Sequence, residues 1–116
     1  MYVSRTQKGS AFPKGEIMPY GTLPLEPAAT VLNYGQGLFE GIKGLKIASF
    51  FTFLIFVLAF RSTKDRIVIF RPSENSRRMN KGASKFLMPP VPEEVFMDAV
   101  SSIVRYNSHW VPPVDR

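Results

Sequence analysis

Proline and glycine punctuate the first quarter of this chain and limit what it can fold into. Between residues 13 and 27 they recur every two to four positions, as Pro13, Gly15, Pro19, Gly21, Pro24 and Pro27. Proline lacks a backbone N–H and clashes with the preceding turn of a helix, and glycine weakens any regular element. No long helix therefore fits there, and regular structure must come from the flanking residues.

Short strands are predicted on both sides of this stretch. Residues 1–5 are suited to open a strand, and apolar residues return from Leu38 to Ile42. Residues 66–70 form a β-branched run that ends before Pro72, as a strand does. The economical interpretation joins residues 38–42 and 66–70 as two strands of a hairpin.

Two helices are predicted after Pro72. The first spans residues 74–81, with Gly82 as its C-terminal cap. The second begins near Pro92, where two glutamates complement the helix dipole, and ends at Asn107. Its apolar face consists of Val95, Phe96, Ala99, Val100, Ile103 and Val104. Strands and helices together predict a small α/β fold.

An uncharged segment, residues 47–60, fits nothing around it. It holds five of the ten phenylalanines and shows neither a helical nor an alternating period. Fourteen residues are few for a membrane span, which needs about 20. Three readings stay open: a marginal membrane anchor, a buried strand or helix, and an insertion foreign to the fold. Positively charged residues lie on both sides of the segment and so indicate no orientation in a membrane. This argues against a membrane role.

Composition excludes several classes of site. The chain has no cysteine, so disulfides and thiolate chemistry are excluded, and its single histidine, His109, belongs to no cluster with metal-ligand spacing. The formal charge of +6 favours anionic partners only weakly. Because its basic segment lacks interleaved aromatic residues, we expect no nucleic-acid partner.

Several ordered motifs together resemble one enzyme family. They are the run from Leu32 to Gly41 (LNYGQGLFEG), then Phe70-Arg71-Pro72, Asn75, Arg78-Met79 and finally Trp110-Val111-Pro112-Pro113. This combination resembles the N-terminal domain of a branched-chain amino acid aminotransferase, a fold-type IV enzyme of amino-acid metabolism that uses pyridoxal 5'-phosphate; the plant enzymes are the most similar. The resemblance implies an incomplete small domain, with a short antiparallel sheet and two helices. Members of the family are roughly three times longer and bind cofactor between two domains.

The resemblance assigns roles to four residues. Arg78 matches the arginine that holds the cofactor phosphate, and its plain alternative is a solvated helix charge. Tyr34 and Phe39 match the aromatic wall around the substrate side chain, with Gly41 against it; without the family, both aromatics would be predicted as core residues. The family's catalytic lysine lies outside this chain, so no catalytic residue is assigned.

The resemblance also indicates where the chain departs from the family. The strand that begins at Phe39 and continues to Gly44 resumes at Phe60 in the family pattern. Residues 45–59 are therefore predicted to be an apolar insertion within a partial domain, residues 1–116, which otherwise follows the family.

The implied parent reaction transfers the amino group of leucine, isoleucine or valine to 2-oxoglutarate, in a homodimer. The isolated chain is expected to be inactive. Two alternatives remain: a non-catalytic fragment that modulates the full-length enzyme, and a basic membrane-associated protein anchored by residues 47–60. The chain as written carries no transit peptide and is expected in the cytoplasm, whereas a chloroplast or mitochondrion fits the parent enzyme.

Overall fold

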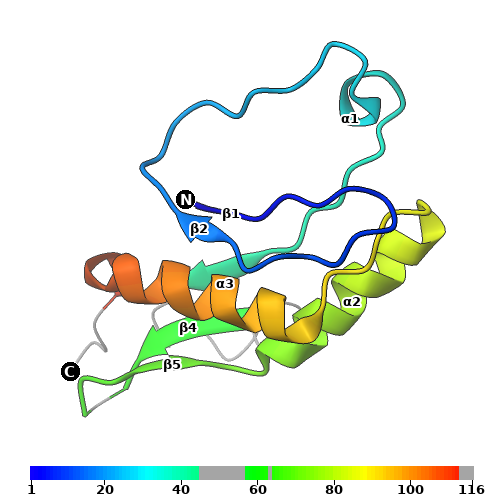
Figure 1. Ribbon diagram of the computed structural model, residues 1–116. Helices are drawn as coiled ribbons and strands as arrows, with labels where there is room; N and C mark the ends of the chain where they lie inside the picture. Colours follow the sequence, from blue (N-terminus) through cyan, green and yellow to red (C-terminus); the bar gives the residue numbers. More distant parts are fainter. Residues whose placement is uncertain (45–56, 63, 113–116) are drawn as a thin grey trace.

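The computed structural model describes residues 1–44, 57–62 and 64–112, which form the layers seen in Figure 1. Its elements in chain order are β1 (Tyr2–Val3), β2 (Glu16–Ile17), α1 (Thr30–Asn33), β3 (Ile42–Gly44), β4 (Val57–Arg61), β5 (Ile67–Ile69), α2 (Pro72–Lys85), α3 (Glu93–Tyr106) and the 3-10 turn η2 (Ser108–Trp110). The predicted α/β class is confirmed. As predicted, no long helix occurs between residues 13 and 27, a stretch that the structure describes in full.

The three-stranded sheet has the order β3-β4-β5. β4 runs antiparallel to β5, with Ala59 opposite Ile69, and parallel to β3. The prediction that residues 38–42 and 66–70 form a hairpin is therefore wrong, because β5 pairs with β4. A tight turn decides this: the N–H of Ser62 donates to the carbonyl of Arg66 at 2.7 Å, which brings the two strand ends together. The sheet is mixed, whereas a purely antiparallel one was expected.

The uncharged segment contributes to this sheet. Its last residues, 57–60, belong to β4, and Ala59 is only 3% exposed. Residues 47–56 of the segment lie outside the described residues, as do residues 45–56 of the predicted insertion. Among the helices that the structure describes, none is long and apolar enough to cross a membrane.

Helix α2 is longer than predicted at both ends. It begins with Pro72, whose fixed φ suits the first helical position, after Arg71 in the left-handed region at φ 47°. It continues through Gly82, so that Gly82 is not the predicted C-terminal cap. A Cβ on Gly82 would lie 2.9 Å from Cδ2 of Leu38. The glycine therefore serves close packing of the loop against the helix.

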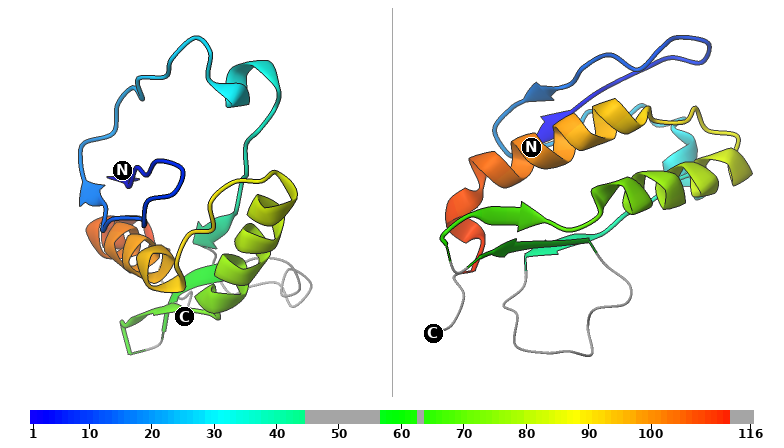
Figure 2. Two further views of the ribbon diagram at one scale, coloured as in Figure 1. Left: turned by 45° about the vertical axis from the view of Figure 1, so that its right-hand side comes forward. Right: turned by 90° about the horizontal axis from the view of Figure 1, so that it is seen from below.

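Helix α3 agrees closely with the prediction and forms the middle layer (Figure 2). Phe96 and Val100 on its apolar face are each 8% exposed. A hollow of about 430 Å³ lies between this face and the sheet residues Ile42 and Ala59. The helix is capped at Asn107, as predicted, where the backbone N–H donates to the carbonyl of Ile103 at 3.0 Å. The buried apolar side chains among the described residues are Phe96 and Val100, together with Ala59 of β4, Ala83 of α2 and Val111.

The N-terminal hairpin of β1 and β2 is joined to the other side of α3 at Asp98, which binds Tyr2 and pairs with Lys14 at 3.5 Å. The hydroxyl of Tyr2 donates to Oδ2 of Asp98 at 2.9 Å and accepts from the N–H of Gly15 at 2.8 Å. A Cβ on Gly15 would lie 2.3 Å from the tyrosine ring, so the ring needs this glycine. Tyr2 therefore links the N-terminal hairpin to the helical layer.

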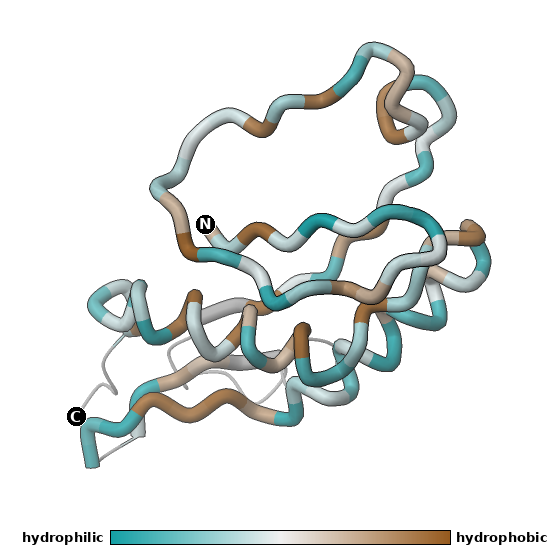
Figure 3. The backbone as a smooth tube through the Cα atoms, in the orientation of Figure 1, coloured by the Kyte–Doolittle hydropathy of each residue, from teal (hydrophilic) through white to brown (hydrophobic). Residues whose placement is uncertain are grey.

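Residues 18–41 form an exposed arch away from this body (Figures 1 and 2). Several apolar side chains on it are open to solvent, including Tyr20 at 95% and Leu32 at 60% exposed, and Figure 3 shows the hydrophobic positions along it. The radius of gyration is 16.0 Å, against about 13 Å for a compact domain of this length. Most of the large apolar side chains of the arch are thus exposed within the part of the chain that the structure describes.

Burial raises the pKa of Tyr2, and its hydrogen bond to Asp98 acts in the same direction. The folded state therefore keeps this proton at a pH where the unfolded chain releases it. This contribution to stability is complete below the ordinary tyrosine pKa of about 10 and is lost as the pH rises through the higher folded value. We expect the unfolding free energy, measured in urea, to fall more steeply above pH ~10 in the unmodified chain than in Tyr2→Phe.

Tyr106→Phe provides the control, because this side chain is 67% exposed on the same helical layer. The control variant should lose stability with pH as steeply as the unmodified chain. Equal pH dependence in Tyr2→Phe and the unmodified chain would contradict the role given to Tyr2.

Candidate functional site

One face of α2 lies against residues 38–41, at the end of the glycine-rich motif. Asn75, Arg78 and Gly82 are spaced by three and then four residues, so they share this face. Asn75 contacts Glu40 and Gly41, Arg78 contacts Glu40, and Gly82 lies against Leu38. The loop and the helix therefore run in opposite directions along each other.

Glu40 is the centre of this contact. Its side chain is 10% exposed. Oε2 accepts a hydrogen bond from Nε of Arg78 at 3.0 Å, and Oε1 accepts one from Nη2 of Arg78. Asn75, which is 2% exposed, donates from Nδ2 to Oε1 at 2.8 Å and to the Gly41 carbonyl at 3.3 Å. A nearly buried carboxylate needs such donors, because an unpaired one is costly to desolvate. Glu40, Asn75 and Arg78 together form what we term the Glu40 clamp.

The clamp fixes the orientation of the Arg78 guanidinium. Nε and Nη2 face Glu40, and among the described residues nothing accepts a hydrogen bond from Nη1. The Arg78 side chain is 51% exposed, so its outer edge reaches solvent. The hydrogen bonds to Glu40 raise the pKa of Arg78, which keeps it charged. The Arg78 cation is therefore oriented by Glu40 and half exposed to solvent.

The neighbouring Arg77 lies in a different environment. It pairs with Glu74 one turn earlier on the same helix, at 2.7 Å, and its side chain is 69% exposed. Arg78 and not Arg77 therefore faces the glycine-rich motif.

Tyr34 and Phe39 do not belong to the core. They are 83% and 91% exposed, so their interpretation as core residues is wrong. Gly35 turns the chain at φ 62°, and Leu38, between the two aromatics, is the side chain that reaches α2. Neither ring lines the hollow beneath α3.

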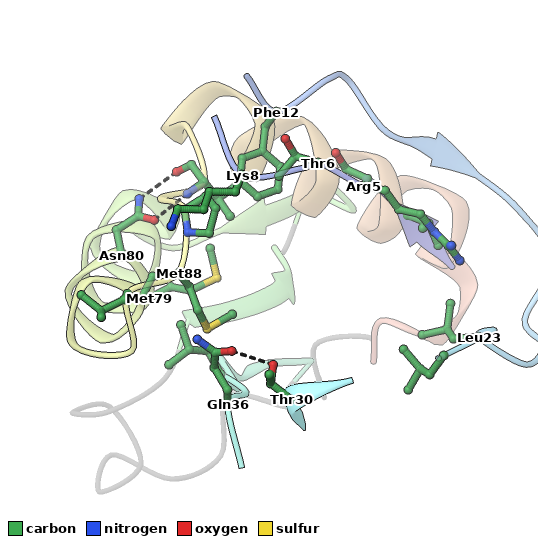
Figure 4. A pocket seen from close by; sticks show the side chains of 18 of the residues that line it. Arg5, Thr6, Lys8, Phe12, Leu23, Thr30, Gln36, Met79, Asn80 and Met88 are labelled. Carbon is green, nitrogen blue, oxygen red and sulfur yellow. Dashed lines mark hydrogen bonds between the residues drawn. The ribbon is translucent and has the colours of Figure 1, made fainter. Parts of the chain in front are cut away.

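A cavity of about 950 Å³ lies between the N-terminal loop, the arch and the carboxyl end of α2 (Figure 4). Gln36 bridges two of these parts: Nε2 donates to the Phe86 carbonyl at 2.7 Å, and Oε1 accepts from the Thr30 hydroxyl at 2.6 Å. Arg5 and Lys8 supply positive charge at its rim. Among the described residues that line it, none is one of the four predicted site residues, Arg78, Tyr34, Phe39 and Gly41.

Sequence reasoning did not assign roles to Glu40, Asn75 and Gln36. A signal for the first was present: Glu40 is the only acid in the run from Leu32 to Gly41, and donors stand three residues apart on the following helix at Asn75 and Arg78. Within the described ranges, no group of three His, Asp or Glu residues gathers as a metal site requires.

Comparison with known proteins gives one consistent result. The chain is 42% identical over 113 residues to branched-chain-amino-acid aminotransferase 6 of Arabidopsis thaliana, covering 97% of this chain and 28% of the relative. It is 40% identical over 116 residues to the chloroplastic branched-chain amino acid aminotransferase 2 of Humulus lupulus, and this match covers 100% of this chain and 25% of the relative. A methionine aminotransferase of Arabidopsis thaliana is 36% identical over 113 residues, and this match covers 97% of this chain and 28% of the relative. The chain thus spans about a quarter of the length of these curated relatives, and no family model matches it.

Exposure predicts the stability effects of the aromatic residues. Tyr34→Ala and Phe39→Ala should change the unfolding free energy by less than about 0.5 kcal/mol, because neither ring is buried. Phe96→Ala is the matched comparison and should cost about 3 kcal/mol or more. Urea unfolding measures all three variants. A loss of about 2 kcal/mol or more in Phe39→Ala would show that the ring is a core residue.

Proposed function

Since the chain belongs to the branched-chain aminotransferase family, we propose that it is the N-terminal small-domain part of a fold-type IV transaminase. The complete enzyme transfers the amino group of leucine, isoleucine or valine to 2-oxoglutarate and uses pyridoxal 5'-phosphate. The observation that carries this proposal is the Glu40 clamp, which presents one edge of Arg78 to solvent.

Arg78 fits the role of a phosphate ligand. A guanidinium offers paired donors to a phosphate, and two of its nitrogens are already held by Glu40, so little freedom is lost on binding. The carboxylate of Glu40 accepts hydrogen bonds from Asn75 and from Nε and Nη2 of Arg78, which leaves Nη1 of Arg78 for an incoming phosphate. The bound cofactor supplies an electron sink for the amino-acid substrate.

Tyr34, Phe39 and Gly41 form part of the substrate wall in this proposal. Phe39 directly precedes Glu40, so the clamp that orients Arg78 also fixes the backbone beside the ring. Its 91% exposure leaves it free to line a pocket that the remaining enzyme closes. An apolar wall discriminates by only about 1–3 kcal/mol per methylene. Such a wall accommodates branched side chains and also the thioether side chain implied by the methionine aminotransferase relative.

The exposed arch supports the partners of this proposal. Exposed apolar patches usually mark an interface, and most of the large apolar side chains between residues 18 and 41 are exposed within the described chain. A second domain and a second subunit of a homodimer would cover them. The chloroplastic relative supports a plastid location for the parent enzyme.

Phosphate binding tests the role of Arg78. Titration of the chain with inorganic phosphate and with pyridoxal phosphate, followed by NMR of the α2 amides, should show binding that Arg78→Ala weakens about tenfold. Glu40→Gln should weaken phosphate binding severalfold, because the Arg78 guanidinium loses the carboxylate that orients it. Arg77→Ala is the matched control and should retain affinity within about twofold. Equal losses from Arg77→Ala and Arg78→Ala would show nonspecific attraction to a basic helix.

The purified chain should not convert leucine. The family's catalytic lysine has no counterpart in this chain, since Lys81 and Lys85 lie in other motifs. Glutamate formation from leucine and 2-oxoglutarate measures this. Activity that disappears in Lys81→Ala or Lys85→Ala would contradict the assignment, whereas activity that survives both identifies a contaminating transaminase.

A further inference from the structure

The parallel strands β3 and β4 pair with a constant offset. Ile42 pairs with Val57, Lys43 with Leu58 and Gly44 with Ala59, so each residue of β3 pairs with the residue fifteen positions later. On its other edge β4 pairs with β5, where Ala59 lies opposite Ile69. The three strands thus place Gly44, Ala59 and Ile69 in one row across the sheet.

The offset equals the length of the segment that separates Gly44 from Phe60. Residues 45–59 number fifteen. Without them, Gly44 would be joined directly to Phe60, which pairs with Val68 in β5. Residues 42–44 would then stand in the chain where residues 57–59 stand now, in the same register. Any other offset would place residues 42–44 at a different height in the sheet.

The two triplets are also similar in sequence. The first residue is β-branched in both, Ile42 and Val57, and the third is small in both, Gly44 and Ala59. Ala59 is 3% exposed and borders the hollow beneath α3, where glycine also fits. The middle residues differ, being Lys43 and Leu58.

We propose that Ile42–Gly44 and Val57–Ala59 are alternative occupants of one position in the sheet, next to β5, and that residues 45–59 divide a single strand. In the chain as it stands the later triplet holds the position because it is joined directly to Phe60. The earlier triplet is displaced outward by one strand spacing, about 4.8 Å, and pairs with its replacement. Removal of residues 45–59 lets the earlier triplet take the position.

Disulfide trapping tests this, because the chain has no cysteine of its own. In the full chain the pair Ala59→Cys with Ile69→Cys should crosslink, because directly paired residues lie within about 4.5–5.5 Å. Gly44→Cys with Ile69→Cys should not, because two strand spacings, about 10 Å, exceed disulfide reach. In the chain lacking residues 45–59, Gly44→Cys with Ile69→Cys should crosslink at least about tenfold more than in the full chain.

A second variant keeps the test decisive if the shortened chain fails to fold. Leu58→Pro in the full chain removes a ladder donor from the central strand and should expel Val57–Ala59. The pair Gly44→Cys with Ile69→Cys should then crosslink in the full chain. The same reactions in concentrated urea give the background. Crosslinking above background in either variant supports the proposal, and its absence in both overturns it.

Discussion

The nearly buried carboxylate of Glu40 is the constraint on which the rest of this structure depends. It sits at the end of an arch with almost no regular structure of its own, and it draws donors from the buried Asn75 and from Arg78 on one face of α2. A buried charge without these partners would be expensive, so the loop and the helix are obliged to stay together. Ile42 and β3 follow two residues later, and the sheet begins from this fixed point.

A second constraint acts from the middle layer. α3 buries its apolar face on the sheet and receives the N-terminal strands on its other side through Tyr2 and Asp98. These contacts link residues 96 positions apart in the sequence, whereas most of the arch between them is exposed. The molecule therefore consists of a small three-layered body and a loop that is anchored at both ends but uncovered. That division matches a chain spanning a quarter of its relatives' length.

Local chemistry explains which features could be predicted from the sequence. The extent of α3 followed from its apolar period, its acidic first turn and the Asn107 cap, all of which act within a few residues. The end of α2 was mispredicted because Gly82 reads as a cap, while its role is contact with Leu38, 44 residues earlier. The partner of β5 depended on pairing across a long separation, and a single sequence does not fix such pairing. The choice of Arg78 over Arg77 as the family's phosphate-binding arginine rested on the neighbouring motif residues and stays a prediction. The orientation of the Arg78 guanidinium required the three-dimensional position of Glu40.

The arch has a consequence for the integrity of the chain. Its backbone between residues 18 and 29 is exposed and lies in no strand or helix, so it is the natural first target for a protease. A cut there would divide the chain but not release the smaller piece, because β1 and β2 remain bound to α3 through Tyr2, and the Glu40 clamp holds the other end of the arch. The nicked protein would persist as two pieces in one particle, so its integrity is best judged under denaturing conditions.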